Sequence, residues 1–213
     1  MRLKFWLKQG FEIFLLILGA SMLYGFLMFI QTDSGLDGLL ILLPLYLIMF
    51  GALMMMGMSI GIYKMAVPLA ISFGSTRNEV LLGLQIFRII PILLISTLAA
   101  LLTAVSGEPA TLPLSAVFPL GIGAFLITSA LGAVIGVIFT KYGKVATIIT
   151  VISIFFVAFG AGFLAAFTED NGFLAGVTFS GKLPWLVLAV GLFLYSISMI
   201  PEQRTVWKCN VKL

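Results

Sequence analysis

The sequence has no histidine, little charge and almost no cysteine. Its 213 residues include one cysteine, and only 9% of them are charged. Without histidine the chain cannot build a haem or zinc site on imidazole ligands, and Cys209 alone cannot form an internal disulfide. Soluble domains carry about 25% charged residues. The low charge therefore excludes a water-soluble fold.

Sequence motifs of common catalytic sites are also missing. The chain has no Gly-x-x-x-x-Gly-Lys-Ser/Thr loop, so it cannot hydrolyse ATP by itself. It has no Gly-x-Ser-x-Gly, no His-Glu-x-x-His and no pair of carboxylates within one apolar run. We therefore expect no catalytic residue, no metal site and no enzymatic activity in this chain, and we expect no nucleic-acid partner.

Apolar residues make up 62% of the chain and fall into long runs. A hydrocarbon core about 30 Å thick requires about 20 apolar residues per helix. Such runs cover about residues 11–30, 39–63, 80–105, 114–140, 145–167 and 183–200. The sequence predicts an all-α integral membrane protein with six transmembrane helices in a single domain, residues 1–213.

Basic residues lie mainly on one side of these runs. Of the 12 lysines and arginines, Lys182 lies on the other side and Arg88 lies within a run. By the positive-inside rule both termini are cytoplasmic. We therefore expect a multi-pass protein of the cell membrane, of bacterial origin. The basic residues assigned to the inner side are Arg2, Lys4, Lys8, Lys64, Arg77, Lys141, Lys144, Arg204, Lys208 and Lys212.

The first ten residues have an amphipathic pattern. Trp6 and Gly10 share one helical face, whereas Lys4 and Lys8 share another. This pattern predicts an interfacial helix, residues 1–10, that lies in the membrane surface before the chain turns to cross. The alternative is a basic flank that only anchors the topology.

Residues 64–79 form the longer inner connection, between the second and third spans. Residues 67–73 fit two helical turns, and Gly74 follows where a helix end favours positive φ. Thr76 and Glu79 then have the spacing of a capping box. The pattern predicts a short helix joined rigidly to two spans and able to transmit force, or alternatively an ordinary connection with well-defined helix ends.

The stretch Pro68-Leu-Ala-Ile-Ser-Phe-Gly-Ser-Thr-Arg-Asn-Glu-Val-Leu-Leu-Gly83 resembles the cytoplasmic segment of type 2 ABC-transporter permeases. In that family Pro-Leu-x-x-Ser-x-Gly-x-Thr-Arg-x-acid leads into the third span. The six predicted spans, the cytoplasmic termini, the amphipathic start and the basic cytoplasmic tail, residues 201–213, are similar too.

The resemblance implies that the short coupling helix docks onto a separate cytoplasmic ATPase subunit, which holds ATP and Mg²⁺. It also implies a second permease copy or homologue in the same complex. This chain has no room for a folded external domain, so the implied cargo is a small hydrophobic or amphipathic peptide, lipid or drug. The residues implied at or near the ATPase contact are Ser72, Gly74, Ser75, Thr76, Arg77, Asn78 and Glu79.

Two other functions remain open, a stand-alone secondary carrier and a non-transporting membrane scaffold. Ion-coupled carriers need an ionisable group at membrane depth. The polar candidates here are Arg88 and the uncharged Gln85 in the third span, and Glu12 near the start of the first. We expect Arg88 to be interfacial or structural, with no buried acid beside it, which argues against proton coupling.

Small residues recur at helical spacing in two spans. Gly57 and Gly61 form one Gly-x-x-x-Gly pair, and Gly132 and Gly136 form another. Such pairs permit close helix approach. We expect both to serve contacts within one subunit rather than a dimer seam.

Overall fold

The computed structural model describes residues 2–32, 36–105, 114–143, 148, 152 and 183–208, and nearly all of these are helical. The described ranges contain no strand, which confirms the all-α prediction. The helices are α1 (Arg2–Thr32), α2 (Leu36–Lys64), α3 (Ala66–Ser72), α4 (Arg77–Val105), α5 (Leu114–Tyr142) and α7 (Leu183–Lys208).

Within the part of the chain that the structure describes, five helices are long and apolar enough to cross a membrane. They are α1, α2, α4, α5 and α7, and each contains or coincides with one of the predicted spans. The remaining predicted span, 145–167, lies outside the described residues except for two positions. The structure is that of a multi-pass helical membrane protein.

The start of the chain differs from the prediction. α1 is one continuous helix from Arg2 to Thr32, so the expected turn after an interfacial helix at residues 1–10 is not observed. Trp6, Gly10 and Ile13 are buried along one face, which attaches the first turns to the bundle. The amphipathic pattern therefore marks a face that packs on protein.

The last helix extends into the segment that was predicted as a cytoplasmic tail. α7 runs through Pro201 to Lys208, and Glu202 and Val206 on its last turns are buried. Most of the segment predicted as a cytoplasmic tail, 201–213, thus extends the last helix, and residues 209–213 lie outside the described part.

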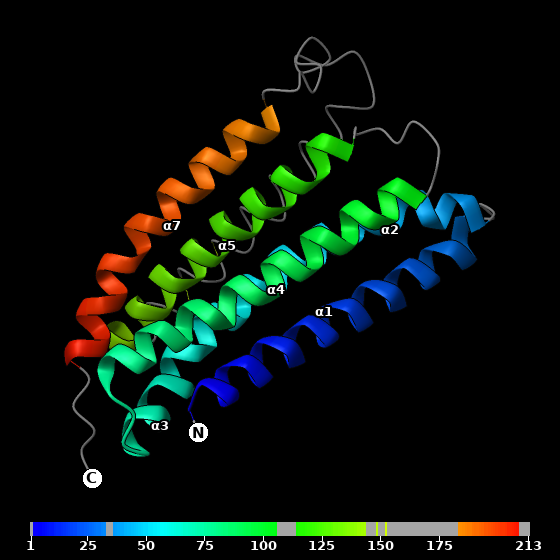
Figure 1. Cartoon of the computed structure of the whole chain (residues 1–213). Helices are drawn as coiled ribbons and strands as arrows, with labels where there is room; N and C mark the ends of the chain where they lie inside the picture. The colour runs from blue at the N-terminus through cyan, green and yellow to red at the C-terminus, as the bar shows by residue number, and fades with distance from the viewer. Residues whose placement is uncertain are drawn as a thin grey trace.

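The long helices run alongside one another, and the start of α1, the short helix α3 and the final turns of α5 and α7 lie at one end of the bundle (Figure 1). The basic residues on these turns are Arg2, Lys4 and Lys8 of α1, Lys141 of α5, and Arg204 and Lys208 of α7. The predicted positive-inside pattern therefore corresponds to one end of the bundle.

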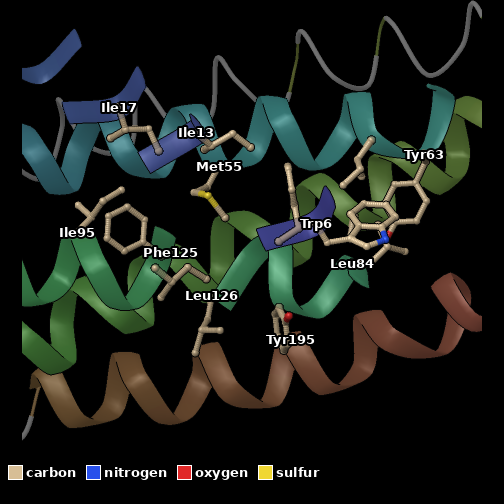
Figure 2. Close-up of a cluster of buried hydrophobic side chains, with 14 of the residues drawn as sticks. Trp6, Ile13, Ile17, Met55, Tyr63, Leu84, Ile95, Phe125, Leu126 and Tyr195 are labelled. Atoms are coloured by element: carbon tan, nitrogen blue, oxygen red, sulfur yellow. The ribbon is translucent and has the colours of Figure 1, made fainter. Parts of the chain in front are cut away.

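A hydrophobic core joins all five long helices. Figure 2 shows Trp6 and Ile13 of α1, Met55 of α2, Phe125 of α5 and Tyr195 of α7 in one cluster. Phe125 is fully buried because it occupies the space over Gly51 of α2, where a Cβ would overlap its ring.

The two glycine pairs have different environments. A Cβ at Gly132 would lie 2.5 Å from the carbonyl oxygen of Met56, and one at Gly136 would lie 2.6 Å from the Tyr63 ring. This pair confirms close approach within the subunit, between α5 and α2. At Gly57 and Gly61 a Cβ would meet no atom of the described residues within 4 Å, so for that pair the described residues show no such contact and the expectation stays a prediction.

Candidate functional site

The predicted coupling segment folds as a short helix with a defined end. α3 spans Ala66–Ser72, close to the predicted 67–73. Its carboxyl end is a Schellman motif, in which the Gly74 amide donates to the Ile71 carbonyl at 2.9 Å and the Ser75 amide donates to the Ala70 carbonyl at 3.0 Å. Gly74 has φ 76°, as predicted. The turn is therefore fixed by hydrogen bonds.

The next helix, α4, begins with the predicted capping box. The Thr76 amide donates to the Glu79 carboxylate at 2.9 Å, and the Glu79 amide donates to the Thr76 hydroxyl at 3.3 Å. These reciprocal bonds satisfy amides that a helix start leaves unpaired. Only four residues separate α3 from α4, so a short hydrogen-bonded turn joins the two helices.

The seven residues implied at the ATPase contact lie together on this connection. All are exposed or partly exposed. Ser72 donates its hydroxyl to the Leu69 carbonyl at 2.7 Å, and the Arg77 guanidinium lies 5.6 Å from the Trp207 ring centroid. The cation–π contact ties the first turn of α4 to the last turn of α7.

An apolar edge, formed by Met65, Leu69 and Phe73, runs along the outer side of α3. Their exposed fractions are 74%, 50% and 73%. The opposite side of α3 is buried through Val67 and Ala70. The spacing of four residues puts the three exposed side chains in one row, so α3 presents an uncovered apolar row at the end of the bundle.

A buried ion pair between α4 and α7 was not predicted. The Arg88 Nη1 atom donates to the Glu202 Oε1 atom at 2.6 Å, and both side chains are almost fully buried. The Arg88 side chain points into the bundle and is buried against Glu202, so the expected interfacial placement is not observed. The expectation of no buried acid was wrong, because Glu202 lies in the helical continuation of the last span.

Polar side chains from three helices surround this pair. Arg88 also donates to the Tyr63 hydroxyl of α2. Gln85 donates to the Glu202 Oε2 atom at 3.3 Å and accepts from the Tyr195 hydroxyl. We call these five residues the polar cluster. It joins α2, α4 and α7 at one level, and its charges compensate each other in a place where an isolated charge would be costly.

Helical spacing could have identified the polar cluster. Gln85 and Arg88 are three residues apart on α4, and Tyr195, Ser198 and Glu202 are spaced by three and four residues on α7. Each set lies on one helical face. Ser198 contributes a hydroxyl 3.4 Å from the Glu202 carboxylate. A row of polar side chains on one face of an otherwise apolar helix indicates such a cluster, and a search for charged residues alone does not detect it.

The start of α1 lies beside α4. The Trp6 ring is 2% exposed and lies directly over Gly83, where a Cβ would overlap the indole. The ring also makes an edge contact with Phe87, with centroids 6.4 Å apart. Figure 2 shows Trp6, Tyr63 and Leu84 from three different helices in the same part of the core. The basic amino end of the chain is thereby attached to the helix that follows the coupling segment.

The described residues do not bring three or more metal-ligating side chains together. Comparison with known protein families, with curated proteins and with solved structures finds no match to this chain. Function must therefore be argued from the coupling segment, the polar cluster and the bundle.

Proposed function

We propose that this chain is the membrane-spanning permease subunit of an ATP-driven exporter of the ABC type. It would act as a dimer with separately encoded ATPase subunits and move a small hydrophobic or amphipathic cargo. The observation that carries the proposal is the rigid connection between α2 and α4, with its capped turn and its uncovered apolar edge.

The apolar edge supports a docking role. An exposed row of Met65, Leu69 and Phe73 fits a helix-in-groove contact, in which an amphipathic helix places its apolar face into a partner. Arg77, Asn78 and Glu79 beside it would give the polar rim. α3 would thus be the coupling helix and the partner's groove would cover the apolar edge.

The polar cluster supports transmission of force. α4 begins four residues after α3, and Arg88 connects it to Tyr63 of α2 and Glu202 of α7. A movement of α3 would therefore displace three helices together. Driving such a switch from 1:99 to 99:1 requires about 5.5 kcal/mol of differential binding, a scale that nucleotide-driven closure of an ATPase pair can reach.

The first experiment is purification of the tagged full chain from its native membrane under mild detergent. Copurified proteins are identified by mass spectrometry and ATPase activity is measured. The variant Leu69→Ala/Phe73→Ala should lower recovery of the ATPase by at least about tenfold, equivalent to 1.4 kcal/mol. The control variant Leu94→Ala/Leu101→Ala removes apolar surface from the exposed face of α4 and should leave recovery unchanged.

Two results would overturn the proposal. One is a chain that purifies with no nucleotide-hydrolysing partner. The other is an ATPase recovered equally well with both double variants, which would show that the apolar edge faces lipid headgroups instead of a protein.

A secondary carrier is a second candidate, because the structure buries an acidic residue beside an arginine. Glu202 could exchange its partner during transport, as ionisable groups at membrane depth do in carriers. This candidate predicts gradient-driven uptake into vesicles that contain this chain alone, with loss of uptake in Glu202→Gln. Absence of such uptake would exclude it.

A further inference from the structure

A cleft of about 650 Å³ lies between α4 and α7, with Leu7 of α1 at its edge. Its walls are mainly apolar, with Leu82, Ile86 and Ile89 on α4 and Met199 on α7. The volume falls within the usual range for small-molecule sites, about 300–1,000 Å³.

The length of the cleft matches one membrane leaflet. Its lining extends along α4 from Asn78 to Ile90, and twelve residue steps of 1.5 Å correspond to about 18 Å. Half of a hydrocarbon core of about 30 Å is about 15 Å. The cleft can therefore accept one hydrocarbon chain that lies parallel to α4 within the leaflet next to the coupling segment.

Polar residues are confined to one part of the lining. Asn78 and Gln203 lie toward the end of the bundle that carries α3, and Gln85 and Glu202 lie deeper. None of the described lining residues is basic. Glu202 accepts from Arg88 through its Oε1 atom, whereas its Oε2 atom accepts from Gln85 over a long 3.3 Å. Glu202 itself is fully buried, so the groups that the cleft offers are the side-chain amides of Asn78, Gln85 and Gln203, each of which can donate and accept.

This distribution excludes some head groups. A phosphate or carboxylate would find no cation on the described cleft wall, because the buried Arg88 is already paired with Glu202, and an uncompensated charge at membrane depth is costly. A head group with hydroxyl or amide donors would instead meet the side-chain carbonyl oxygens of Asn78, Gln85 and Gln203. The lining therefore complements an uncharged, hydrogen-bond-donating head attached to an apolar chain.

We propose that the α4–α7 cleft is a binding site for a single-chain amphiphile with an uncharged, donor-bearing head group, such as a monoacylglycerol. Assigning this amphiphile as the cargo rests on the proposed function. The binding itself requires neither ATP nor a partner, so it can be tested on the chain alone.

The test uses the full chain in phosphatidylcholine nanodiscs without any ATPase. The probe is a monoacylglycerol with a photoreactive diazirine at the end of its chain, and a matched probe carries a phosphate head on the same chain. After illumination, labelled peptides are mapped by mass spectrometry. We expect the uncharged probe to label residues 81–90 of α4 at least about tenfold more than the phosphate probe, a ratio equivalent to 1.4 kcal/mol.

Two variants fill the cleft, and a third variant serves as a control. Ile89→Trp and Leu82→Trp each place a large ring in the space lined by these partly exposed residues, and each should reduce labelling by about tenfold. Leu94→Trp adds the same ring to an exposed position of α4 outside the cleft and should leave labelling unchanged. Two filling variants are used so that the misfolding of one does not end the test.

The proposal is overturned if both probes label α4 equally, because the cleft would then hold any bulk lipid. It is also overturned if the filling variants and the control label equally. Failure to recover an ATPase would remove the proposed exporter and leave this binding result intact, so the two failures are distinguishable.

Discussion

Arg88 of α4 and Glu202 of α7 form a buried ion pair with a 2.6 Å hydrogen bond, although 114 positions separate them in the sequence. The guanidinium also lies 5.7 Å from the Tyr63 ring centroid and 5.9 Å from that of Tyr195. The pair is therefore enclosed by aromatic rings and by Gln85. This enclosure connects the helix that follows the coupling segment to the last helix of the bundle.

Breaking the ion pair from one side should be strongly destabilising. Arg88→Met or Glu202→Met leaves one buried group without its charged partner, which costs about 3–5 kcal/mol. The double variant Arg88→Met/Glu202→Met replaces both charges with apolar chains of similar length and should recover much of that loss. Thermal or denaturant unfolding of the purified chain in detergent measures these effects.

Lys8→Met provides the control for the ion pair. It breaks the exposed pair between Lys8 and Glu12, whose atoms are 3.6 Å apart, and should change stability by less than about 1 kcal/mol. Additive losses in the Arg88/Glu202 double variant would contradict the assigned pairing.

Gly83→Ala should weaken the attachment of α1 to α4. The added methyl would overlap the buried Trp6 indole, and overpacking of this kind costs about 1–3 kcal/mol. Adding Trp6→Leu removes the clash, so the double variant should lose less stability than the sum of the two single variants. Unfolding curves of the four proteins measure the coupling.

Gly19→Ala is the control on α1, because a Cβ there meets no atom within 4 Å of the described residues. It should change stability by no more than about 1 kcal/mol. If Gly83→Ala behaves like Gly19→Ala, the close contact between Trp6 and Gly83 is wrong.

Gly132 and Gly61 should respond differently to the same substitution. Gly132→Ala directs a methyl at the Met56 backbone, where a Cβ would be 2.5 Å from the carbonyl oxygen, and backbone cannot move aside as a side chain can. We expect a loss of at least about 1–3 kcal/mol. At Gly61 a Cβ would meet no atom of the described residues within 4 Å, so Gly61→Ala should stay within about 1 kcal/mol of the parent, as unfolding in detergent can test.

The capped turn before α4 should control local opening. Thr76→Ala removes the hydroxyl that accepts from the Glu79 amide, and loss of such a cap costs about 0.5–2 kcal/mol. Gly74→Ala forces a side chain onto φ 76°, at about 1–2 kcal/mol. Both should speed hydrogen exchange in the first turn of α4, whereas Gly74→Asn should do so less.

Thr97→Ala is the matched control for the cap. The Thr97 hydroxyl donates to the Leu93 carbonyl at 2.7 Å on the exposed face of α4, so its loss should leave exchange at the start of the helix unchanged. Unaltered exchange in Thr76→Ala would show that the capping box does not hold the turn closed.

Local interactions were the part of the site that could be predicted. The positive φ of Gly74, the short helix before it and the reciprocal bonds of Thr76 and Glu79 all follow from residues within a few positions of one another. Their partners are fixed by helix geometry alone. The long apolar runs likewise predicted the helices, because a hydrocarbon core sets the length that a span requires.

Interactions between helices could not be predicted in the same way. The two glycine pairs have the same spacing, yet Gly132 and Gly136 contact α2, whereas Gly57 and Gly61 contact no neighbouring helix among the described residues. A repeated spacing fixes which residues share a face, but not which neighbour that face meets.

By itself the sequence determined that the chain is an all-helical membrane protein, where most of its spans lie and how the connection between α2 and α4 is capped. Only the tertiary structure decided that Arg88 meets Glu202 and that Trp6 covers Gly83. The reason is physical. Hydrophobicity and capping act along the chain, whereas these pairs depend on how each helix is rotated and placed in the bundle, and packing of all the side chains sets that arrangement at once.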